Sequence, residues 1–166
     1  MGRRLLALLL SATALAAATG CGTDDRKAVR GTVRDMVVAV VNERDAKVCS
    51  LLTDRARTSF VSFSRRYWKL WDSGKIEPRP QGLPPEPRTC EQARVVMDPF
   101  RWGTPPHPEQ LAHDPELLSG LDGARIAIDG DRATVTRFKL PLARRPLRLV
   151  RTSAGWRFAQ VPFNVF

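Results

Sequence analysis

Proline divides this chain into parts that must fold by different rules. Ten of the thirteen prolines lie between residues 72 and 115. Proline lacks an amide hydrogen and has a fixed φ, so it interrupts helices and central strands. The proline-rich insertion at 72–115 is therefore predicted to be a long connection, with a short helix around residues 90–96. A connection of this length inside one domain needs a contact that ties it down.

The residues before this insertion have helical periodicity. Apolar residues from Val29 to Val41 recur at steps of three, four and one, which traces one face of an α-helix. A second helical stretch covers residues 46–52. A third begins after a candidate N-cap at Thr53-Asp54 and extends to residue 70 or 71.

Strand patterns follow the insertion. Residues 125–128, 133–138, 147–151 and 156–161 alternate or carry β-branched side chains, and glycine-containing turns separate the first pair and the last pair. Helices followed by antiparallel strands predict an α+β fold. The length suits a single domain over residues 28–166 with one core.

The N-terminus carries three features in the order of an export signal. Arg3 and Arg4 form a positive region, residues 5–18 form an uncharged, mostly apolar run, and small residues lead to Cys21. The run is too short for a transmembrane helix, which needs about 20 apolar residues. We expect residues 1–20 to be a signal peptide.

Residues 18–21 resemble the lipobox, the cleavage site of bacterial lipoproteins. Gly20 and Cys21 match that pattern, whereas Ala18 stands where leucine is usual. The resemblance implies that the Cys21 thiolate receives a diacylglyceryl group, and a second acyl chain such as palmitate gives stable anchoring. It implies an extracytoplasmic lipoprotein of the cell envelope, with residues 21–27 as lipidated cysteine and polar tether. The alternative is an ordinary secreted protein in which Cys21 occurs by chance.

Two further cysteines, Cys49 and Cys90, remain once Cys21 is assigned to the lipid. An even pair in an oxidising compartment predicts a disulfide, which would tie down the proline-rich insertion. Metal binding is the weaker alternative. The chain has no C-x-x-C motif, and His107 and His113 are remote in sequence from both cysteines.

The chain is strongly basic. Its formal net charge is +10 and falls to +8 when Arg3 and Arg4 leave with the signal peptide. Basic charge attracts anionic lipid headgroups, wall polymers and nucleic acid. Export argues against a nucleic-acid partner. The arginines are scattered along the sequence, so the charge can equally reflect a composition rich in Arg, Ala, Pro and Gly.

Four short stretches, taken in order, resemble exported actinobacterial members of the nuclear transport factor 2-like superfamily. They are residues 42–53 (NERDAKVCSLLT), 89–91, 128–135 and 149–157. The resemblance implies a cone, in which a curved antiparallel sheet wraps around helices and encloses a pocket. Some members of that superfamily are isomerases, dehydratases or cyclases, and others only bind ligands or partners. Fold alone therefore does not decide the function.

An isomerase of this fold would place an Asp or His base opposite a Tyr or a protonated Asp. The candidates sit in no recognisable catalytic pattern. We therefore assign no catalytic residue, no metal site and no cofactor. The residues considered for acid–base or metal chemistry are Tyr67, Asp72, Asp98, His107, Glu109, His113 and Asp114.

Aromatic side chains are the candidates for an apolar pocket. The alternative is that they form core and cover the open end of the cone. The sequence favours a non-catalytic module that binds an envelope protein or an apolar ligand, over a small-molecule enzyme of the isomerase, dehydratase or cyclase type. Convergent titratable groups inside the cone would favour the enzyme, and a filled apolar interior would favour the module. The possible pocket residues are Phe60, Phe63, Tyr67, Trp71 and Trp156.

Overall fold

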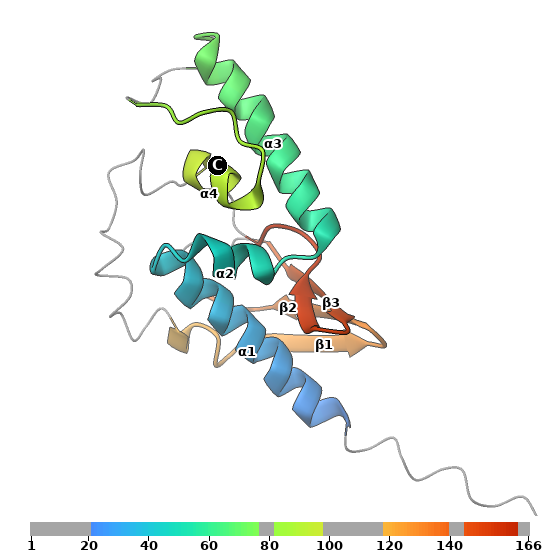
Figure 1. Cartoon of the computed structure of the whole chain (residues 1–166). Helices are drawn as coiled ribbons and strands as arrows, with labels where there is room; N and C mark the ends of the chain where they lie inside the picture. Colours follow the sequence, from blue (N-terminus) through green and yellow to red (C-terminus); the bar gives the residue numbers. More distant parts are fainter. Residues whose placement is uncertain (1–20, 77–81, 98–117, 140–144, 163–166) are drawn as a thin grey trace, which may run out of the picture.

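Four helices precede a four-stranded sheet in the computed structural model, which describes residues 21–76, 82–97, 118–139 and 145–162. This order confirms the α+β prediction (Figure 1). The short helix expected inside the proline-rich insertion is also confirmed, as α4. The elements are α1 (Cys21–Val41), α2 (Asp45–Ser50), α3 (Asp54–Asp72), α4 (Cys90–Val96), β1 (Arg125–Asp129), β2 (Arg132–Thr136), β3 (Leu147–Thr152) and β4 (Gly155–Phe158).

The strands form one antiparallel meander in the order β1-β2-β3-β4. Two glycines permit its tight turns, because Gly130 has φ 53° and Gly155 has φ 91°, in the left-handed region. Side chains alternate between the two faces, and the register places Ile126 opposite Val135 and Leu149 opposite Phe158. These apolar positions form the buried face.

Two strands end earlier than the sequence pattern predicted. β2 ends at Thr136, because Arg137 has φ 55° and turns the backbone out of the extended conformation. β4 ends at Phe158, although the pattern extended to residue 161. The apolar residues beyond the ends of these strands are partly buried against the core without belonging to a strand.

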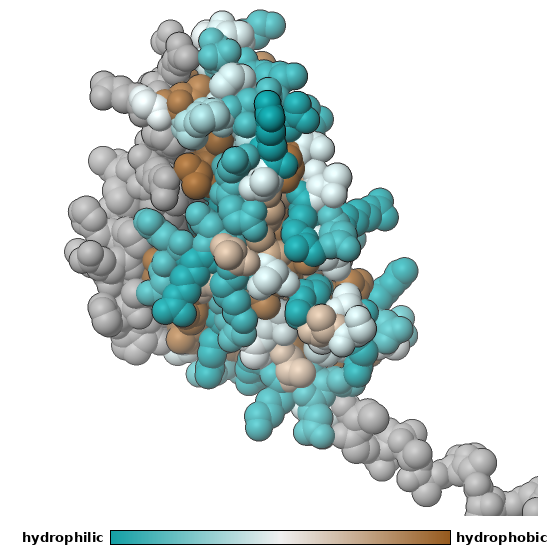
Figure 2. Space-filling view, in the orientation of Figure 1, coloured by the Kyte–Doolittle hydropathy of each residue, from teal (hydrophilic) through white to brown (hydrophobic). Residues whose placement is uncertain are grey.

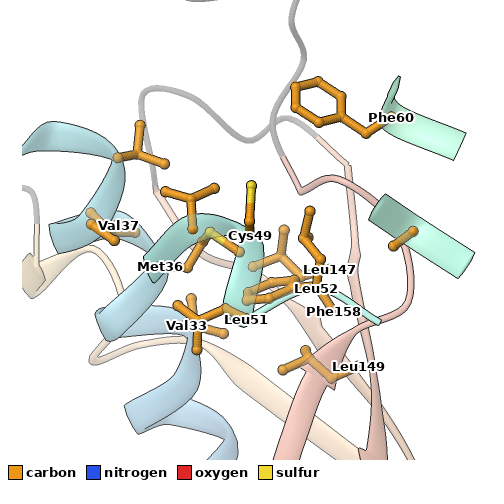
Figure 3. Packing of buried hydrophobic residues seen from close by; sticks show 14 of the residues in the cluster. Val33, Met36, Val37, Cys49, Leu51, Leu52, Phe60, Leu147, Leu149 and Phe158 are labelled. Carbon is orange, nitrogen blue, oxygen red and sulfur yellow. The ribbon is translucent and has the colours of Figure 1, made fainter. Parts of the chain in front are cut away.

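Helix α1 covers the apolar face of the sheet, where it packs against β1 and β4 (Figure 1). Its buried stripe includes Val29, Val33 and Met36, each at most 1% exposed. Figure 3 shows side chains from α1, from α2 and its connection to α3, and from the sheet converging on one core. Burial of this stripe stabilises the helix more than its intrinsic propensity does.

The residues expected to form a polar tether are helical. α1 runs from Cys21, so residues 22–27 belong to its first turns. Asp24 lies in the first turn, where the helix dipole favours negative charge. Asp25 forms an ion pair with Arg151 of β3, which fixes these turns to the sheet.

The edge of β4 that pairs with no other strand is covered by the connection between α2 and α3. The Phe158 amide donates to the Leu51 carbonyl at 2.8 Å, and the Thr53 amide donates to the Phe158 carbonyl at 3.0 Å. Thr53 also caps α3, since its hydroxyl accepts from the Ala56 amide at 3.2 Å. The predicted N-cap is confirmed, and the connection protects the sheet edge from pairing with other chains.

The predicted disulfide is confirmed. Cys49 of α2 and Cys90 of α4 are bonded, with Cα atoms 5.9 Å apart. Helix α3 packs on α4. The disulfide therefore joins these two helices to α2, whose residues Val48 and Cys49 belong to the core. None of the helices in the described part of the chain is long and apolar enough to cross a membrane.

Candidate functional site

The buried side chains of the described residues are almost all apolar. Met36, Leu52, Leu149 and Phe158 are each at most 2% exposed. Among the described residues, Ser64 and Arg94 are the buried polar or charged ones. Acid–base catalysis needs titratable groups that face a reacting atom. The buried part of the described residues therefore consists of apolar packing, with Ser64 and Arg94 as its polar members.

Arg94 lies on α4 and forms an ion pair with Asp45 of α2. Its Nε lies 3.3 Å from Oδ1 of Asp45, and the Arg94 side chain is 7% exposed. Its Nη2 atom is buried without a hydrogen-bond partner. Arginine stays protonated near neutral pH and cannot act as a base. The ion pair therefore fixes α4 to α2, on the same two helices that the disulfide joins.

Four of the five candidate pocket residues lie along α3. Phe60 and Trp71 are buried. The rings of Phe63 and Tyr67 have centroids 4.9 Å apart, and those of Tyr67 and Trp71 are 5.9 Å apart. Both spacings are typical of stabilising aromatic pairs.

The segment at residues 82–88 contacts the aromatic side of α3. The indole N–H of Trp68 donates to the Pro84 carbonyl at 2.7 Å. Leu83 also packs against the core. On the face seen in Figure 2, hydrophobic residues occur in small separate areas between hydrophilic side chains. These contacts join the aromatic side of α3 to the segment at 82–88.

Trp156 lies apart from the other pocket candidates. It is buried on β4, and the guanidinium carbon of Arg151 lies 4.9 Å from the centroid of its ring. β4 packs against β3 and α1, whereas α3 packs on α4. The structure therefore places four of the candidates along α3 and the fifth, Trp156, on the buried face of the sheet.

The candidates for acid–base chemistry do not converge in the described residues. Asp72 is exposed at the end of α3, and Tyr67 is half-buried. Asp98, His107, Glu109, His113 and Asp114 lie outside the described residues. Within the part of the chain that the structure describes, no three His, Cys, Asp or Glu side chains are grouped so as to hold a metal ion.

No family model, curated protein or solved structure matches this chain.

A shallow hollow follows the polar side of α3. Its lining includes Ser59, Ser62 and Arg66. Two further lining cations share one carboxylate, since Arg65 Nε lies 2.9 Å and Lys69 Nζ 3.9 Å from Oε1 of Glu86. The hydrogen bond from Arg65 holds the pKa of Glu86 below its ordinary value. These contacts connect α3 to the segment at 82–88. One carboxylate faces three lining cations, so the hollow remains basic.

The outer face of the sheet carries a basic surface that sequence reasoning missed. We call it the arginine face and define it by Arg125, Arg132, Arg148 and Arg157, one from each strand. Three of them are exposed, and Arg157 is half-buried. The signal was present, because all four alternate with inward apolar residues such as Ile126 and Phe158. Their grouping appears only when strands far apart in sequence pair.

Proposed function

We propose that this protein is a lipid-anchored extracytoplasmic lipoprotein whose mature chain begins at Cys21. The Cys49–Cys90 disulfide carries this proposal, because it engages the other two cysteines and leaves Cys21 for the lipid. Disulfides persist in oxidising, extracytoplasmic compartments. The order of charge, apolar run and small residues before Cys21 supports the same reading.

The proposed fold family is the nuclear transport factor 2-like superfamily. The matching stretches fall on equivalent kinds of element: residues 42–53 span α2, residues 89–91 begin α4, and residues 128–135 and 149–157 form the two hairpins. The packing of α1 on one face of an antiparallel meander is compatible with the cone that this superfamily implies.

The proposed activity is binding without catalysis. The apolar character of the described buried residues supports it, because a cone enzyme needs convergent titratable groups around its pocket. The partners are then the cell membrane, through the lipid anchor, and an envelope protein or apolar ligand at the surface. Turnover of a model steroid enone that is lost in Asp72→Asn would overturn this assignment in favour of an isomerase.

Metabolic labelling tests the anchor. Cells expressing the full chain are grown with a palmitate analogue, and the tagged protein is detected after purification. The wild type should carry the tag, and Cys21→Ser should lose it and appear in the medium or as uncut precursor. Thr19→Ser, a conservative change in the same motif, should keep the tag. A tagged Cys21→Ser protein would contradict lipidation at this position.

A further inference from the structure

We propose that the arginine face binds the anionic phospholipid surface of the membrane that carries the lipid anchor, an inference that rests on the anchor proposed above. Cross-strand register brings its side chains together. Arg132 and Arg157 both lie opposite Val150, on the strands that flank β3. In the next row Arg148 lies opposite Thr134. The face therefore crosses all four strands, opposite to the face covered by α1.

The charge on this face is mostly uncompensated. Asp129 is the one acidic residue at an outward strand position, and it lies opposite Arg132. In the described residues no ion pair engages Arg125, Arg132 or Arg148. A guanidinium group matches the geometry of a phosphate and binds it through two parallel hydrogen bonds.

The neighbouring side chains suit an extended, planar partner. Ala127, Thr134, Thr136 and Val150 are small, so the arginines stand above a low sheet surface without an intervening ridge. A second copy of this chain stacked on the face would bring arginines against arginines, and like charges repel. A layer of anionic headgroups complements the whole face at once.

The start of α1, which carries Cys21, is joined to the same sheet by contacts on its other face. Asp25 pairs with Arg151, and Arg151 also contacts Asp131 in the turn between β1 and β2 and stacks on Trp156. Cys21 lies four residues before Asp25 on the same helix, a rise of roughly 6 Å. The Asp25–Arg151 ion pair therefore connects the helix that begins at Cys21 to the sheet, so a lipidated Cys21 keeps the sheet within a short distance of the bilayer.

Vesicle sedimentation without any acyl chain tests this proposal. The chain from residue 21 carrying Cys21→Ser retains every described element. It should sediment with vesicles of mixed phosphatidylglycerol and phosphatidylcholine, and remain in solution with phosphatidylcholine alone. Each basic residue near an anionic surface contributes about fivefold in binding, so Arg132→Gln/Arg148→Gln should weaken binding about twenty-five-fold. Binding should also disappear at 1 M salt, where the Debye length is about 3 Å.

The matched control is Arg55→Gln/Arg66→Gln, which removes the same charge from exposed positions of α3. Its loss of vesicle binding should be about tenfold smaller than the loss in the sheet variant. Equal losses in both variants, binding to phosphatidylcholine alone, tighter binding to soluble polyphosphate, or a stable dimer through the sheet would each contradict the proposal. Because no lipid is attached to the protein, failure here leaves the labelling of Cys21 intact, and loss of that labelling leaves this result intact.

Discussion

At the residue scale, Arg94 is the described charged residue that most needs a compensating partner, because its guanidinium group is buried. A buried guanidinium is tolerated when a carboxylate and hydrogen bonds compensate it, and removing the partner leaves an uncompensated charge. Asp45 is that partner, at 3.3 Å and 20% side-chain exposure. Asp54 occupies the equivalent first position of α3, but its carboxylate is 93% exposed and pairs with Arg57 at the surface. The two aspartates therefore form a matched pair that differs in burial.

Substitution of these aspartates separates a structural ion pair from a surface one. Asp45→Ala should lower the free energy of unfolding by about 1–3 kcal/mol, because it strands the Arg94 charge. Asp54→Ala should change it by about 1 kcal/mol or less. Adding Arg94→Met to Asp45→Ala should recover part of the loss. Urea denaturation measures all three, and equal effects of the two aspartate variants would show that Arg94 does not depend on Asp45.

At the element scale, a seven-residue helix persists among prolines because two features fix its start. Thr89 and Gln92 form a capping box, in which each side chain accepts from the backbone of the other residue. Cys90, the first residue of α4, is bonded to Cys49 of α2. The helix is too short to form in isolation, so it depends on these contacts and on packing against α3.

Loss of the disulfide should remove a large fraction of the free energy of unfolding of the domain. The bond closes a loop with a sequence separation of 41, for which chain entropy gives about 4 kcal/mol. Net stabilities of domains are about 5–15 kcal/mol. Cys49→Ala/Cys90→Ala should therefore shift the urea midpoint well below that of Thr89→Ala, a cap variant expected to cost about 1 kcal/mol. Coincident midpoints would contradict this, as would two alkylatable thiols in protein purified from the envelope.

At the scale of the whole molecule, local signals in the sequence were enough to place the elements. The periodicity of residues 29–41, the cap at Thr53 and the turn at Gly130 each predicted the element that forms there. Such local signals do not predict contacts between segments that are distant in the sequence. The arginine face requires the register of four strands. The ion pair at the start of α1 requires Arg151, which is remote from Asp25 in the sequence.

The Asp25–Arg151 ion pair holds the helix that begins at Cys21 against the sheet. Lipidation of Cys21 is tested most directly by mass spectrometry of the N-terminus of protein isolated from the envelope. Trypsin cleavage after Arg26 should release a peptide covering residues 21–26, with a diacylglyceryl group on Cys21. A peptide that reads across residues 20 and 21, or an N-terminal Cys21 without lipid, would contradict the account.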